Sequence, residues 1–106
     1  MHMHGRYSRK GDKVSSYRNS YTDKLIETIS KLNTKKDCYD FFEDVCTIKE
    51  ILDMSKRLEA AKLLSEGMNY KQIISKIDIS SATLSRVSKA LNYGTGGYKK
   101  VIKDKT

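Results

Sequence analysis

The sequence contains no proline and no tryptophan, and only three of its six glycines precede residue 94. Because proline and glycine most often interrupt helices, the middle of this 106-residue chain is expected to be almost entirely helical. No apolar run approaches the roughly 18 residues that a membrane span needs. No apolar segment follows the basic residues near the N-terminus, as a signal peptide would require. These absences favour a cytoplasmic, all-α protein with one domain.

Cysteine and histidine are also scarce. Cys38 and Cys46 lie eight positions apart, without a C-x-x-C spacing or a nearby histidine. They are therefore predicted to be reduced, buried thiols and not a metal or redox site. Both histidines fall within the first four residues, and no nucleophile lies beside a candidate base. The sequence thus predicts a protein that is not an enzyme, with no catalytic residue, no metal site and no cofactor.

The formal net charge of +8 is unevenly distributed along the chain. Residues 1–20 hold five basic side chains and one acidic one, and residues 99–106 hold four and one. We predict a largely disordered basic arm at 1–20, a single helical domain at 21–98 and a basic C-terminal tail at 99–106. The two charged ends either keep the protein soluble or touch phosphate groups, and charge alone leaves both explanations open.

Two helices are predicted in the first half of the domain, over about 22–31 and from about Lys35 onward. Their apolar stripes are Leu25, Ile26, Ile29 and Leu32 in the first, and Cys38, Phe41, Phe42 and Val45 in the second. The other face of the second helix carries Asp37, Asp40, Glu43 and Asp44. A catalytic or metal cluster would need a histidine partner or a second acidic motif, so these carboxylates are predicted to form a solvated face.

Capping signatures mark the next two helix starts. Thr47 and Glu50 have the spacing of a capping box, and the helix that they open is predicted to stop at Gly67. Asn69 and Gln72 open a short helix over about 70–77, and a last helix follows over about 80–91. Because the joint between these two helices is so short, they must cross steeply.

This crossing pair fits the helix-turn-helix pattern, which places apolar residues at the fourth, eighth, tenth, fifteenth and eighteenth of twenty positions. Counted from Tyr70, these positions hold Ile73, Ile77, Ile79, Leu84 and Val87. The remaining side of the second helix is small, hydroxyl-rich and basic, which suits a helix in the major groove of DNA. An ordinary helical hairpin with a polar face is the alternative. The predicted DNA-binding residues are Lys71, Ser80, Ser81, Ala82, Thr83, Ser85, Arg86 and Lys89.

A resemblance to a known family is carried by residues 46–98, CTIKEILDMSKRLEAAKLLSEGMNYKQIISKIDISSATLSRVSKALNYGTGGY. They resemble the tryptophan-repressor superfamily, and its YerC/YecD-type branch shares the SRVSKALNYGTGGY-like end. The resemblance implies an intertwined, all-helical homodimer with one helix-turn-helix head per subunit. It also implies a sequence-specific transcriptional regulator, of the repressor type, on a two-fold symmetric operator of double-stranded DNA. A helical protein–protein adaptor built on the same scaffold is the alternative.

The chain departs from the tryptophan-binding member of this family in two respects. After the recognition helix, the Gly-rich and basic NYGTGGYKKVIKDKT predicts a truncated or absent final helix. In that relative two arginines and two threonines hold the ligand, and the matching residues here are Thr47, Arg57, Thr83 and Arg86. Its glycine beside the indole ring is replaced here by the stiff, inward-pointing Val87. We therefore expect no tryptophan corepressor; a repressor with another small-molecule effector near Arg57 and Arg86 is the alternative.

Overall fold

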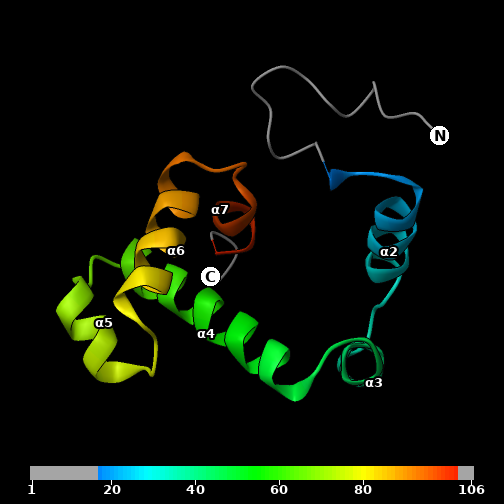
Figure 1. Ribbon diagram of the computed structural model, residues 1–106, viewed down its shortest axis with the longest axis horizontal. Helices are drawn as coiled ribbons and strands as arrows, with labels where there is room; N and C mark the ends of the chain where they lie inside the picture. Colours follow the sequence, from blue (N-terminus) through cyan, green and yellow to red (C-terminus); the bar gives the residue numbers. More distant parts are fainter. Residues whose placement is uncertain (1–16, 103–106) are drawn as a thin grey trace. The chain divides into compact units, whose positions relative to one another are not determined.

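The structure, a computed structural model, describes residues 17–102, which form helices α2 to α7 and no β-strand (Figure 1). The predicted all-α class is confirmed. Contacts within the chain define two compact units, Met1–Val45 and Cys46–Thr106. That residues 21–98 form one domain stays a prediction.

The first unit holds α2 (Ser20–Ser30) and α3 (Lys35–Val45). Helix α2 begins two residues before the predicted start because Asn19 caps it: its side-chain oxygen accepts hydrogen bonds from the backbone N–H groups of Tyr21 (2.8 Å) and Thr22 (2.9 Å). No residue of α2 or α3 is buried within the chain. Both helices therefore leave their apolar stripes at least partly open.

The acidic face of α3 is exposed as predicted, at Asp37, Asp40, Glu43 and Asp44. The two cysteines are free, but they are half-buried and not buried as predicted. Cys38 is not buried because it lies on the apolar stripe of α3, a helix on which no residue is buried within the chain.

The second unit is organised by α4 (Ile48–Ser65), whose two ends follow the sequence prediction. At its start, Thr47 Oγ1 accepts a hydrogen bond from the Glu50 N–H (3.1 Å), and Glu50 accepts one from the Thr47 N–H (2.8 Å). Beyond its end, Gly67 has a φ of +95°, in the left-handed region where a glycine is not strained. The predicted capping box and glycine stop are both confirmed.

Three shorter helices pack against α4: α5 (Tyr70–Lys76), α6 (Ser81–Tyr93) and α7 (Gly97–Ile102) (Figure 1). The core of the unit lies where they meet, and consists of Ala60, Ala61, Leu63, Ile73, Leu84 and Val87. The final helix is short, as predicted. It also includes residues 99–102, which the sequence assigned to the tail, because Tyr98 and Ile102 pack against the core.

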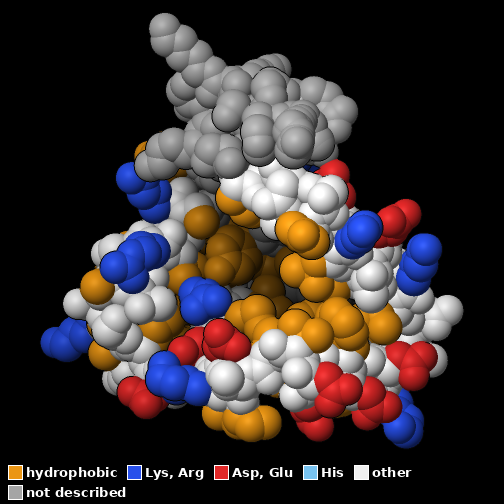
Figure 2. All heavy atoms as spheres, turned by 45° about the vertical axis from the view of Figure 1, so that its right-hand side comes forward, with side chains coloured by type: hydrophobic (Ala, Val, Ile, Leu, Met, Phe, Trp, Pro, Cys, Tyr) orange, Lys and Arg blue, Asp and Glu red, His pale blue; other side chains and the backbone are white. Residues whose placement is uncertain are grey.

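Large hydrophobic side chains remain uncovered on α4 as well. Ile48 is 63% exposed, Leu52 53% and Leu58 48%, whereas the buried residues of α4 all lie in its last six positions. Figure 2 shows hydrophobic side chains that lie open at the surface of the molecule. The part of α4 before Ala60 thus carries an apolar surface that its own unit leaves without full cover.

Candidate nucleic-acid interface

Helices α5 and α6 form the predicted helix-turn-helix. The chain leaves α5 at Ile77, whose backbone is extended (φ −130°, ψ 151°), and re-enters helix after Ser80, the N-cap of α6. Of the five apolar positions in the pattern, Ile73, Leu84 and Val87 are at most 2% exposed. Ile77 and Ile79 pack against the same cluster from the turn. The apolar count that identified the motif is confirmed at all five positions.

The burial of one side of α6 determines what its other side presents. Leu84, Val87 and Leu91 recur at helical spacing and are all buried. Five of the predicted DNA-binding residues lie on the exposed remainder of this helix: Ser81, Ala82, Ser85, Arg86 and Lys89. The outer face of α6 therefore carries small side chains near its N-terminus and positively charged side chains further along.

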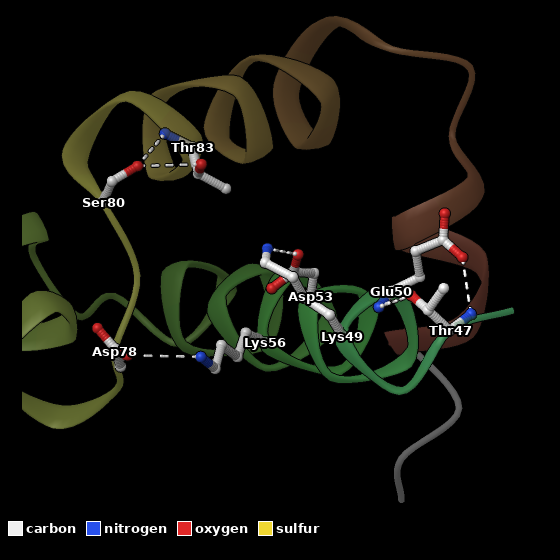
Figure 3. A network of polar contacts seen from close by, with 8 residues as sticks. All are labelled: Thr47, Lys49, Glu50, Asp53, Lys56, Asp78, Ser80 and Thr83. Atoms are coloured by element: carbon white, nitrogen blue, oxygen red, sulfur yellow. Dashed lines mark hydrogen bonds and ion pairs between the residues drawn. The ribbon is translucent and has the colours of Figure 1, made fainter.

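The start of α6 is ordered by side-chain hydrogen bonds (Figure 3). Ser80 Oγ accepts a hydrogen bond from the Thr83 N–H (3.1 Å) and donates one to Thr83 Oγ1 (3.0 Å). The Thr83 hydroxyl keeps its own proton for another acceptor. Lys71, the one predicted contact outside α6 and its N-cap, is exposed in the first turn of α5.

A polar cleft of about 190 Å³ lies between α4 and the start of α6. From α4 it is lined by Lys49, Asp53, Lys56 and Arg57, and from the turn and α6 by Asp78, Ile79, Ser80 and Thr83. Of the four residues that match the family's ligand-holding positions, it brings Arg57 and Thr83 together. The Thr47 hydroxyl is engaged in the α4 capping box, and Arg86 does not line the cleft.

Two ion pairs lie among the residues that line this cleft (Figure 3). Lys49 Nζ donates a hydrogen bond to Asp53 Oδ2 (2.8 Å), which raises the pKa of Lys49 and lowers the pKa of Asp53. Lys56 Nζ lies 3.6 Å from Asp78 Oδ2 and so links α4 to the turn between α5 and α6. Both pairs are solvent-accessible, so each contributes little to stability.

Sequence reasoning did not find these ion pairs. The Lys49–Asp53 pair has i,i+4 spacing on a helix, a signal that could have been used. Lys56 and Asp78 are far apart in the sequence, and only the packing of α5 and α6 on α4 brings them near each other. The cleft is thus a consequence of tertiary structure.

Residues 17–102 hold no group of three or more His, Cys, Asp or Glu side chains that could bind a metal ion. Within the same range, no helix is both long enough and apolar enough to cross a membrane.

Comparison with known proteins gives the same family from sequence and from structure. A family model described as Trp repressor protein matches residues 20–106. The chain is 39% identical over 89 residues to YerC of Bacillus subtilis (strain 168), an uncharacterized protein; the match covers 84% of this chain and 86% of YerC.

Two crystal structures superimpose on the chain. One, from Staphylococcus aureus and described as a candidate Trp repressor, has a TM-score of 0.83 and 33% identity, covering 88% of this chain and 93% of that one. The other, a TrpR-like protein from Eubacterium eligens ATCC 27750, has a TM-score of 0.78 and 45% identity, covering 81% and 89%. These matches confirm the resemblance seen in residues 46–98. The chain belongs to the Trp repressor family.

Proposed function

We propose that this chain is a sequence-specific transcriptional regulator, a repressor, that binds a two-fold symmetric DNA operator in the cytoplasm as a homodimer. The observation that carries the proposal is the division of α6 into two faces. Leu84, Val87 and Leu91 are buried, and the opposite face is exposed with small side chains first and cations after them. Small residues let a helix backbone approach base edges closely, and cations further along can meet phosphates.

Membership of a family of DNA-binding regulators supports this assignment. In the proposed complex with DNA, the residues facing the bases would be Ser80, Ser81, Ala82 and Ser85. Lys71, Thr83, Arg86 and Lys89 would contact phosphates or base edges. The basic ends, at 1–20 and 99–106, lie mostly outside the described residues; they would add affinity that does not depend on sequence.

The proposed homodimer is supported by the exposed apolar surfaces. Helices α2 and α3 have 11 residues each and no buried residue, and isolated helices of that length are marginal in water. The first half of α4 offers further uncovered side chains, including Ile48 and Leu52. A second copy could cover both sets, and a two-fold dimer would present two heads to successive major grooves.

The proposed independence from tryptophan is supported by Val87. Its side chain is 2% exposed and belongs to the core cluster. An indole ring inserted beside it would overpack a filled site. Arg57, on the cleft, and Arg86, on the exposed face of α6, would then serve as structural or phosphate-binding residues.

The proposal is tested by selecting an operator from random duplex DNA with the full chain and measuring its affinity by fluorescence anisotropy. The log–log dependence of affinity on salt should have a slope of about −0.9 for each neutralised phosphate. Arg86→Ala and Lys89→Ala should each weaken binding by about 1–3 kcal/mol. Lys36→Ala, on α3 and 82% exposed, is the charge-matched control and should bind like the parent.

Two outcomes would reject the proposal. If the parent selects no operator and shows no DNA affinity at low salt, the scaffold serves another purpose, such as a protein–protein adaptor. If the parent binds but both α6 variants bind equally well, α6 is not the helix that reads DNA.

A further inference from the structure

The outer face of α6 continues past the residues assigned above. Ala82, Arg86, Lys89 and Tyr93 are spaced i, i+4, i+7 and i+11, which places them on one stripe of an α-helix with 3.6 residues per turn. The buried residues Leu84, Val87 and Leu91 lie on the opposite side of the same helix. Tyr93 is therefore aligned with the two cations and points away from the core.

Tyr93 is 84% exposed, the highest value among the large hydrophobic side chains of residues 17–102. Its hydroxyl makes no hydrogen bond within that range. The chain leaves the helix directly after it, at Gly94, whose backbone is extended (φ −87°, ψ −157°) while its N–H still donates a hydrogen bond to the Ala90 carbonyl (2.9 Å). A Cβ at position 94 would collide with that carbonyl oxygen, so the turn depends on glycine.

The length of α6 indicates what Tyr93 can reach. At 1.5 Å per residue, Tyr93 lies about 16 Å along the helix axis from Ala82. The major groove is about 12 Å wide. If Ala82 lies over base edges, as the proposed function requires, Tyr93 lies at or beyond the edge of the groove, where the sugar–phosphate backbone runs. Tyrosine suits that position, since its ring packs against apolar sugar carbons and its hydroxyl donates to phosphate.

We infer that Tyr93 is a DNA-backbone contact, which packs its ring on a deoxyribose and donates its hydroxyl hydrogen bond to a phosphate oxygen. This inference rests on the proposed function. Tyr93 would add an uncharged contact at the C-terminal end of the stripe, after the cations Arg86 and Lys89. A contact of this kind strengthens binding to every sequence, because sugars and phosphates are the same in all of them.

The test compares the full-length parent, Tyr93→Phe and Tyr93→Ala on the selected operator and on a scrambled duplex of equal length and composition. Tyr93→Phe should bind both duplexes about tenfold more weakly, as expected for a lost hydrogen bond to a charged group, and Tyr93→Ala more weakly still. The ratio of the two affinities should not change. The salt slope of Tyr93→Phe should equal that of the parent, whereas Lys89→Ala should reduce the slope by about 0.9 if that lysine touches phosphate.

Tyr39→Ala, on α3 and 63% exposed, is the matched control, because Tyr39 lies outside the apolar stripe of that helix; it should bind like the parent. Unchanged affinity of both Tyr93 variants would overturn the inference while leaving the proposed function in place. Weaker binding to the operator alone would also overturn it, because Tyr93 would then read a base. A change in oligomeric state would assign the ring to a protein interface and overturn it too. If the parent binds no DNA, the proposed function fails first and this inference fails with it.

Discussion

Among single residues, Val87 is one of those that hold α6 against the core. It is 2% exposed and lies in the cluster with Leu84 and Ile73. A β-branched side chain in a helix has one strongly preferred rotamer, so it fills its space with a nearly fixed shape. We expect this filling to hold α6 in one orientation without a ligand.

Val87→Ala should lower the free energy of unfolding by about 2–3 kcal/mol, since it removes two buried methyl groups and leaves a cavity. Urea denaturation followed by circular dichroism at one protein concentration measures the change. Ser85→Ala, on the exposed side of the same helix, should stay within about 0.5 kcal/mol of the parent. Equal stability of the two variants would show that Val87 does not fill the core as described.

L-Tryptophan should not bind the parent protein. A calorimetric titration up to about 1 mM should give no saturable heat, because overpacking at Val87 would cost at least about 1–3 kcal/mol. Operator affinity should likewise not change when tryptophan is added. Micromolar binding, or an affinity for DNA that rises with tryptophan, would refute this expectation.

At the scale of elements, helix boundaries set by neighbouring residues could be predicted from the sequence. The capping pairs Thr47–Glu50 and Asn69–Gln72 both form, because each needs only residues three positions apart. The start of α2 was predicted two residues late, since asparagine at position 19 was not considered as a cap. The apolar pattern of α5 and α6 predicted their packing, because a fixed short joint restricts how two helices can cross.

Features that depend on distant residues could not be predicted in this way. The docking of α7 through Tyr98 and Ile102 requires the groove that α4 and α6 form together. The Lys56–Asp78 pair and the cleft around it arise only once α5 and α6 pack on α4. The candidate DNA-binding face, in contrast, could be predicted from the sequence, because the five apolar positions of the motif already indicate which side of α6 is left exposed.

Thr47→Ala should lower the free energy of unfolding by about 1 kcal/mol, because the Glu50 N–H loses its acceptor at the start of α4. Thr47→Ser keeps that acceptor and should remain close to the parent. Urea titrations of the three proteins give the comparison. Thr47 also matches a ligand-holding position of the family, so operator affinity is measured on the folded variants; a large loss there would assign the hydroxyl a role in binding.

At the scale of the whole molecule, the proposed binding to a two-fold symmetric operator requires a second copy of the chain. The described helices of the first unit hold no buried residue, and α4 leaves Ile48, Leu52 and Leu58 about half exposed or more. Such uncovered apolar surface on a small monomer usually marks an interaction site. A homodimer would cover it and would also place two copies of α6 at a fixed separation.

The Leu58→Ala substitution tests whether a second copy of the chain covers the apolar surface of α4. In a free monomer, truncation of this half-exposed leucine should cost about 1 kcal/mol, roughly half of what full burial contributes. Beneath a partner, the same change should cost about 2–5 kcal/mol and should make the melting temperature depend on protein concentration. Phe42→Ala on α3 should behave in the same way. Glu59→Ala, at the next and exposed position of α4, is the control and should leave both the stability and its concentration dependence unchanged.

The most direct measurement is a hydroxyl-radical footprint of the full chain on its selected operator, together with the number of chains bound per duplex from sedimentation. We predict two equivalent protected half-sites, with centres about 10–10.5 base pairs apart, and two chains on each duplex. A two-fold dimer with one copy of α6 per chain requires that pattern. A single protected half-site with one bound chain, or no protection at a concentration that saturates binding, would contradict it.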